Sequence, residues 1–329
     1  MPLAPSQSVA VSLEPVQRRI EAALGRVSGE LRAAAGHLFA AGGKGLRPTL
    51  VLLSAEACAC DAATRRTPDW EAVHDVAAAA EMIHVASLIH DDIIDEARAR
   101  RGRPAVNRRF GNHTAVLAGD FLFAAAFGLL SPHAHSGVVT LFTDAIAQMC
   151  QGEMMQKDQA YDPNVTEPQY TARVRGKTAA LLAACCESGA RLAGADEPAC
   201  EALRGFGLNL GLAFQIIDDI LDFEGDEERM GKPAGTDLLQ GNLTLPVIRL
   251  LERSHWRQRI APRITSRQID QETLDLVKEG IRITGALEAA RAAGHMLALQ
   301  ALQHLNALSA SEAVRALQRL CHAAVDRAY

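Results

Sequence analysis

The chain has 329 residues, of which 48% are hydrophobic, 22% charged and only 4% aromatic, and its formal net charge is −5. The negative balance argues against a nucleic-acid-binding protein, which needs a basic face to displace counterions. Abundant Ala and Leu with few aromatics favour packed helices over sheets. The seven cysteines show no CxxC pair or zinc-type spacing, so we expect buried thiols in a reducing compartment.

Apolar residues recur at helical spacing in long blocks, and no block alternates as a strand would. Polar turns separate the blocks, and none resembles a linker between independently folded halves. We therefore expect one all-α domain over residues 1–329, an antiparallel bundle joined by short turns. The segment 224–242 is polar and Gly-rich, as expected of a lid or binding loop. The predicted helices cover residues 13–40, 47–60, 70–97, 113–131, 137–158, 168–193, 197–223, 243–262, 268–280, 283–307 and 310–328.

Two further features bear on the location of the chain. Its first residues lack the charged start and apolar stretch of a secretory signal, which predicts a cytoplasmic protein. Residues 121–143 contain no Asp, Glu, Lys or Arg, but a polar turn at 131–137 interrupts them well short of a membrane span. We expect two buried helices joined by a turn, and no integral membrane segment.

Two DDxxD clusters each end an apolar helical block. Within a cluster the first and last Asp are i and i+4, so their carboxylates lie one turn apart on one helix face. A single such motif is most often a solvated helix end. Acid at a helix C-terminus opposes the helix dipole, however, and its occurrence there twice calls for a compensating ligand. Oxygen ligands of this kind suit Mg²⁺ with bound phosphate. The clusters comprise Asp91, Asp92 and Asp95, and Asp218, Asp219 and Asp222.

Polar and basic side chains accompany these clusters. His84 and Gln215 share the helix faces of the first and second cluster, although a lone His on a helix is usually a core residue. Basic residues also occur in several separate loops, each of which alone would indicate only a solvated surface. Together they fit two diphosphate substrates better than one. The loop cations are Lys44, Arg47, Arg98, Arg100, Arg101, Arg103, Lys177 and Lys232.

The motifs GGKGLRP, EMIHVASLIHDDIIDEARARRGRPAVN, LAGDFLFA, GKTAALL, FQIIDDILDF and GKPAGTDLLQGNLTLP resemble those of the trans-isoprenyl diphosphate synthases, or polyprenyl synthetases. The resemblance spans about residues 40 to 250 in the right order, and medium- and long-chain members such as heptaprenyl and octaprenyl diphosphate synthases are the most similar type. It implies the isoprenoid synthase fold, an orthogonal helical bundle around a central cavity, and usually a homodimer. It also implies a prenyltransferase that condenses isopentenyl diphosphate with an allylic diphosphate.

The same resemblance implies roles for individual residues. Two or three Mg²⁺ ions per site would be held by Asp91, Asp92, Asp95, Asp218, Asp219 and Asp222. The allylic diphosphate would be bound by Arg100, Lys177, Thr178, Gln215 and Lys232. Isopentenyl diphosphate would be bound by Lys44, Arg47, His84 and Arg101. The residues implied to carry catalysis are Asp91, Asp92, Asp95, Asp218, Asp219, Lys177 and Lys232.

The chain departs from the family pattern at two positions. The family usually has GGKRxRP, and Gly45 stands in place of that Arg, which weakens isopentenyl diphosphate binding in principle. Many members have a Lys where Asn242 stands, so the loop loses a charge. Ala86 and Ser87, just before the first cluster, are small where short-chain members have bulky aromatics, which predicts a product longer than geranylgeranyl diphosphate. The alternative is that deeper residues close the tunnel, among them Phe121, Phe123 or Phe127.

Three rival functions remain open at this stage. A terpene cyclase shares the bundle and one DDxxD, but it usually carries a different second motif and lacks GGKxxRP. A metal-dependent phosphohydrolase is suggested by His84 and the His90-Asp91 pair, but it would need further His ligands. A catalytically silent subunit of a heteromeric synthase would typically lose its acidic motifs, and this chain retains both.

Overall fold

The computed structural model describes residues 12–59, 67–100, 102–224 and 235–326. Strand structure within these ranges is limited to a two-residue antiparallel hairpin, β1 (Ala99–Arg100) and β2 (Arg103–Pro104). The helical elements are, in chain order, α1 (Glu14–Leu24), α2 (Gly29–Ala40), α3 (Leu46–Ala59), α4 (Trp70–Ile94), α5 (Val106–Leu130), η2 (Ser131–Ser136), α6 (Val138–Gln159), α7 (Glu167–Val174), η3 (Arg175–Ala179), α8 (Ala180–Leu192), α9 (Glu197–Glu224), α11 (Thr236–Leu239), α12 (Leu245–Leu251), α13 (Ser254–Thr265), α14 (Gln271–Thr284), α15 (Ala286–His304), η4 (Leu305–Ala307) and α16 (Glu312–Val325).

The predicted helical blocks match most of these elements; α11 lies in the segment predicted as a loop, and four further differences concern the blocks themselves. The block 13–40 divides into α1 and α2, and the block 243–262 divides into α12 and α13. Helix α5 begins seven residues earlier than predicted, with a break at Gly111, whose φ is +80°. The block 168–193 contains the π-helical turn η3 between α7 and α8. Periodicity misses such breaks because the apolar face continues across them.

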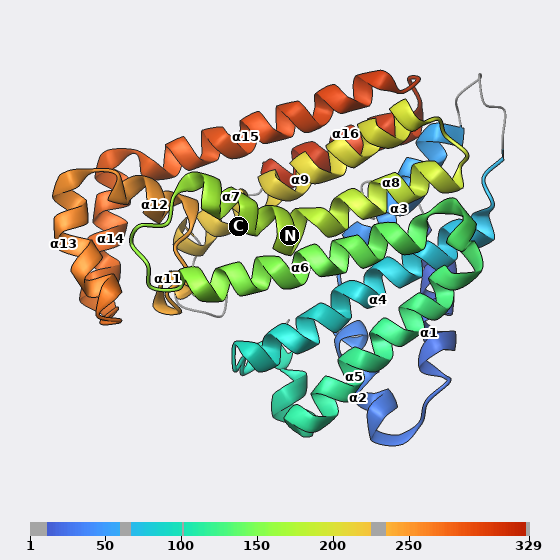
Figure 1. The fold of residues 1–329 in the computed structure, drawn as a ribbon, viewed down its shortest axis with the longest axis horizontal. Helices are drawn as coiled ribbons and strands as arrows, with labels where there is room; N and C mark the ends of the chain where they lie inside the picture. The colour runs from blue at the N-terminus through green and yellow to red at the C-terminus, as the bar shows by residue number, and fades with distance from the viewer. Residues whose placement is uncertain (1–11, 60–66, 101, 225–234, 327–329) are drawn as a thin grey trace.

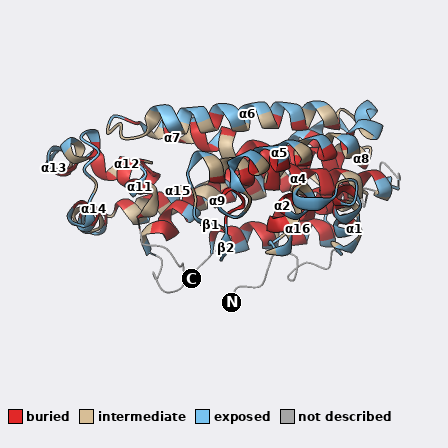
Figure 2. Cartoon of the chain, turned by 90° about the horizontal axis from the view of Figure 1, so that it is seen from below, coloured by how far each residue is buried: buried red, intermediate tan, exposed pale blue. Residues whose placement is uncertain are grey.

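The long helices lie side by side in an elongated bundle, and α12, α13 and α14 gather at one end of it (Figure 1). Helix α4 packs against α5 and α3, α8 packs between α3 and α9, and α15 packs along α9. Buried residues concentrate on α4, α8 and α9, while the outer face of α6 is exposed (Figure 2). Glycines allow the closest approaches: a Cβ on Gly189 would lie 2.3 Å from Val51 O, and one on Gly207 2.6 Å from Leu182 O.

Two predictions about buried groups need correction. Cysteines 58, 185, 186, 200 and 321 are buried as predicted, but Cys150 is exposed. Residues 121–143 are predicted to form two buried helices joined by a turn, but helix α5 is less buried than this. By length and composition two segments could cross a membrane, Trp70–Ile94 and Val106–Ser136, and their most apolar windows are 72% and 39% buried. The first is a core helix of the bundle; the second leaves apolar side chains exposed.

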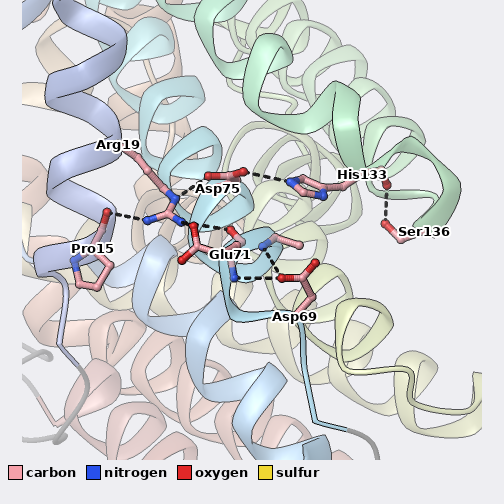
Figure 3. Close-up of polar contacts among 8 residues, drawn as sticks. Pro15, Arg19, Asp69, Glu71, Asp75, His133 and Ser136 are labelled. Atoms are coloured by element: carbon pink, nitrogen blue, oxygen red, sulfur yellow. Dashed lines mark hydrogen bonds and ion pairs between the residues drawn. The ribbon is translucent and has the colours of Figure 1, made fainter.

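A polar cluster fixes the N-terminal end of α4, shown in Figure 3. The carboxylate of Asp75 accepts one hydrogen bond from Arg19 of α1 and lies 3.0 Å from Nε2 of His133 in η2. Arg19 also pairs with Glu71, and Asp69 caps α4 by accepting from the first backbone N–H groups. The cluster therefore joins three elements at the end of α4 opposite its aspartates.

Candidate active site

Most of the predicted site residues line one cavity of about 720 Å³. They come from the start of α3, the C-terminal half of α4, β1, η3 and the C-terminal part of α9, and the two acidic clusters therefore open onto the same space. The predicted residues in its wall are Arg47, His84, Ser87, Asp91, Asp95, Arg100, Lys177, Thr178, Gln215, Asp218, Asp219 and Asp222.

Three predicted site residues that the structure describes are not in this wall. Asp92 and Ala86 are fully buried, and Lys44 is exposed beside the cavity-lining Arg47. Arg101 and Lys232 lie outside the described residues, as do positions 225–234 of the predicted lid loop. Glycine at 45 suits the local backbone, because its φ is +58° and a Cβ there would lie 2.6 Å from Leu13 Cδ1.

The first acidic cluster divides its carboxylates between the cavity and the protein interior. Asp91 and Asp95, one turn apart at the end of α4, face the cavity. Burial raises the pKa of Asp91 to about 6, opposed by the positive charge of Lys177, and burial also raises the pKa of Asp95. Asp92 instead turns toward Arg100, whose guanidinium lies 2.6 Å from Oδ1. This ion pair fixes β1 against the C-terminal end of α4.

The second cluster is held by a chain of hydrogen bonds. The hydroxyl of Tyr170 donates to Asp219 Oδ2 at 2.6 Å, and the Gln215 amide donates to Asp219 Oδ1 at 2.8 Å. Thr178 in turn donates to Gln215 Oε1 at 2.9 Å. Burial, reinforced by the charge of Asp237, raises the pKa of Asp219 to about 8. The side chain of Asp222 accepts from the backbone N–H of Asp237, which ties α11 to α9.

The π-helical turn η3 places Lys177 and Thr178 in the cavity wall. Lys177 Nζ pairs with Glu153 of α6 at 2.6 Å and also donates to Gln156. This pairing requires α6 to approach the backbone of η3 closely: a Cβ on Gly152 would lie 2.4 Å from Lys177 N. Single π-turns are frequent at functional sites because they redirect side chains within a helix.

The wall residues that the sequence analysis missed include the ionisable side chains of Glu153, Tyr170, Arg173 and Asp237. Tyr170 could have been found, because it precedes Lys177 by seven residues, two helical turns, and so lies on the same face. Arg173 could have been found in the same way, because it precedes Lys177 by four residues, about one helical turn. Glu153 and Asp237 contact the site only through tertiary packing, so no local spacing identifies them.

The donor set suits a hard divalent cation. Carboxylate oxygens of Asp91, Asp95, Asp218 and Asp222 line the cavity, and the buried Oδ2 of Asp92 has no hydrogen-bond partner among the described residues. Across the described ranges no three His, Cys, Asp or Glu side chains already converge on one point. The carboxylates in the cavity wall fit Mg²⁺, which is commonly held by one or two carboxylates and completes its octahedron with phosphate oxygens and water.

Comparison with known proteins decides the family. The polyprenyl synthetase model matches residues 28–281. The chain belongs to the polyprenyl synthetase family. It is 41% identical to heptaprenyl diphosphate synthase component 2 of Geobacillus stearothermophilus over 280 residues, which cover 85% of this chain and 84% of the relative.

Solved structures of related enzymes have the same fold as this polyprenyl synthetase. A decaprenyl diphosphate synthase from Rhodobacter capsulatus superimposes with a TM-score of 0.87 at 33% identity, covering 98% of both chains. A polyprenyl synthase from Caulobacter crescentus CB15, solved with calcium and isoprenyl diphosphate, gives 0.84 at 35% identity, covering 96% of this chain and 98% of that one. The sequence-based predictions of the family, of an all-α fold and of a prenyltransferase are confirmed.

Proposed function

We propose that this polyprenyl synthetase condenses isopentenyl diphosphate with an allylic diphosphate and releases a polyprenyl diphosphate longer than geranylgeranyl diphosphate. The observation that carries the proposal is the convergence of both acidic clusters on one cavity whose wall also contains Lys177 and Arg100. Neither a silent subunit nor a phosphohydrolase accounts for two retained acidic clusters that share a cavity wall with these cations.

The allylic diphosphate is proposed to bind where the two clusters face each other. Asp91, Asp95, Asp218 and Asp222, supported by Asp92 and Asp219, would hold Mg²⁺, two or three ions in all, and bound Mg²⁺ would neutralise charge that develops on the leaving diphosphate. The direct protein contacts would come from Arg100, Lys177, Thr178 and Gln215, which line the same space. The related Caulobacter structure contains a divalent cation and an isoprenyl diphosphate, which supports this assignment.

Isopentenyl diphosphate is proposed to bind at the start of α3. Arg47 and His84 line the cavity, and Lys44 is on the exposed turn before them. Gly45 keeps the backbone in the left-handed conformation and provides no charge, so this subsite depends on Arg47 and Lys44.

The proposed reaction follows from where charge lies. Lys177 and Arg100 stabilise the departing diphosphate as the carbon–oxygen bond breaks, and the resulting allylic cation is attacked by the isopentenyl double bond. Apolar wall residues such as Phe123, Ile146 and Phe214 exclude water that would otherwise trap the cation. A proton lost to the departing diphosphate restores the double bond, so the reaction needs no separate protein base.

Small residues near the first cluster support a long product. Ser87 lines the cavity, whereas Ala86 is fully buried and does not line it. Phe123 is also in the wall, so it is the alternative residue that would close the tunnel which the small Ser87 leaves open.

We further propose one domain over residues 1–329, a homodimer and a cytoplasmic location. A dimer contact would cover the exposed apolar side chains on α5 and α6, where Val116, Leu117, Met154 and Met155 are 43%, 47%, 54% and 39% exposed. The relative from Geobacillus is named as a component, so light scattering of the purified chain should decide between a dimer of this chain and a monomer that needs another subunit.

The decisive experiment incubates the purified protein with Mg²⁺, labelled isopentenyl diphosphate and, in turn, geranyl, farnesyl and geranylgeranyl diphosphate, and sizes the products by chromatography. Label is expected in products longer than geranylgeranyl diphosphate. Release of phosphate from an allylic diphosphate alone would support a phosphohydrolase, and products no longer than geranylgeranyl diphosphate would refute the predicted chain length.

A further inference from the structure

A buried arginine in the cavity wall, Arg173, takes no part in the proposed reaction. Arg173 lies at the end of α7, one turn before Lys177, and its side chain lines the cavity although the residue is only 5% exposed. Its guanidinium donates to Leu243 O at 2.7 Å and to Gln159 Oε1 at 3.2 Å, and it stacks over the Tyr170 ring at 5.4 Å. These contacts fix its position.

All of these partners are neutral. Two other cations of the wall pair with carboxylates: Arg100 pairs with Asp92, and Lys177 pairs with Glu153. Within the described part of the chain Arg173 has no carboxylate at salt-bridge distance. Burial lowers the pKa of Arg173, and it outweighs the negative charges of Asp219, Asp237 and Glu153, which act on the guanidinium from farther away. Both oxygens of Asp219, the acidic side chain linked to it through Tyr170, already accept hydrogen bonds from Tyr170 and Gln215. Because a buried guanidinium is costly without a counter-charge, its position next to a ligand cavity indicates an anionic ligand.

The number of hydrogen-bond donors on the Arg173 guanidinium also fits an anionic ligand. A guanidinium carries five N–H groups in a planar fork. Two of them are used by Leu243 and Gln159, which leaves three for a ligand. A planar fork of donors matches the oxygens of a phosphate.

Arg173 also reaches the loop in which this chain lacks a cation. Its hydrogen bond to Leu243 O joins α7 to the residue that follows Asn242, and Asn242 lines the same cavity. The neutral amide of Asn242 provides no charge at this wall, whereas the guanidinium of Arg173 stands beside the same loop segment.

We propose that Arg173 is a diphosphate-binding residue, whose guanidinium supplies from α7 the positive charge that Asn242 does not supply from the loop. This inference rests on the proposed function, since the anion is the diphosphate of the allylic substrate.

The test measures binding of inorganic diphosphate with Mg²⁺ by titration calorimetry, together with KM for farnesyl diphosphate. Arg173→Met removes the charge at similar volume and should weaken diphosphate binding about tenfold to a hundredfold, the range for a charge-assisted hydrogen bond. Arg173→Lys retains the charge and should lose less. Adding Asn242→Lys to Arg173→Met should restore a large part of the affinity. Arg249→Met is the control for loss of a part-buried arginine, because Arg249 donates to the backbone carbonyl of Ala289 and pairs with Glu167 at the start of α7 but is not in the cavity wall.

Circular dichroism and thermal melting show whether each variant is folded. If folded Arg173→Met binds diphosphate as tightly as the wild type, or loses no more affinity than Arg249→Met, the inference is overturned. If adding Asn242→Lys to Arg173→Met restored no affinity for diphosphate, the idea that Arg173 supplies the charge missing at position 242 would also be refuted. A wild type that binds diphosphate but never elongates a primer would refute the proposed function and leave the role of Arg173 in anion binding intact.

Discussion

Substitution of Gly152 by alanine should separate α6 from η3 and misplace Lys177. The added Cβ would lie 2.4 Å from Lys177 N and 3.0 Å from Arg173 O, both backbone atoms that cannot rotate away. To reach the 3.4 Å of an ordinary contact, the two segments must move apart by about 1 Å. A misplacement of this size at a catalytic group costs roughly a hundredfold in rate. Overpacking should also lower the free energy of unfolding by about 1–3 kcal/mol.

The assay is kcat for elongation of farnesyl diphosphate, measured well below the melting temperature of the variant. Gly36→Ala is the matched control, because Gly36 also lies within a helix but its added Cβ would meet only Leu24 Cδ1 at 3.7 Å. We expect this control to retain activity and to be no less stable, since alanine has the higher helix propensity. A folded Gly152→Ala enzyme with wild-type kcat would show that close packing of α6 on η3 does not position Lys177.

The other predictions concern the second cluster, pH, chain length and the cluster of Figure 3. Tyr170→Phe removes the donor to Asp219 and should lower Mg²⁺ affinity in calorimetry by several-fold, with circular dichroism unchanged. Burial raises the pKa of Asp91 to about 6 and of Asp219 to about 8. Between about pH 4 and pH 8 the folded metal-free protein therefore keeps protons on these carboxyls that the unfolded chain has lost. Its free energy of unfolding should fall as the pH rises through this range. Since Mg²⁺ competes with those protons, the rise in melting temperature on adding Mg²⁺ should be larger at pH 8 than at pH 6, and an equal rise would contradict these shifts. Ser87→Phe should shorten the product, and Ala86→Phe should do so only by displacing its neighbours; unchanged products from both would show that Phe123 or another residue closes the tunnel. Asp75→Ala leaves Arg19 and His133 without their shared partner and should lower the free energy of unfolding in urea by about 1–3 kcal/mol, while kcat stays at the wild-type value.

Local spacing was sufficient for much of this site. The i, i+4 pattern of Asp91 and Asp95 requires both carboxylates to share one helix face, whichever neighbours that helix has. The same holds for Gln215 and Asp219, which form a hydrogen bond within α9. The family motifs follow from the order of residues alone, so the all-α fold and the prenyltransferase class could be predicted before any contact was known.

Other features depended on tertiary packing. Asp92 turns inward because the hairpin brings Arg100 to it, and Tyr170 reaches Asp219 across 49 residues of sequence. The breaks within residues 13–40 and 168–193 do not interrupt the apolar face, so periodicity runs through them.

The sequence by itself determined which helices carry the acidic and basic groups and which face each group takes, because those properties follow from covalent order and helical geometry. Only the tertiary structure decided that both clusters share one cavity, that Lys177 pairs with Glu153, and that Arg173 stands in the wall beside Asn242. Such contacts join helices that are distant in the chain. They depend on how closely those helices pack, which is set by the sizes of the side chains and by the glycines between them.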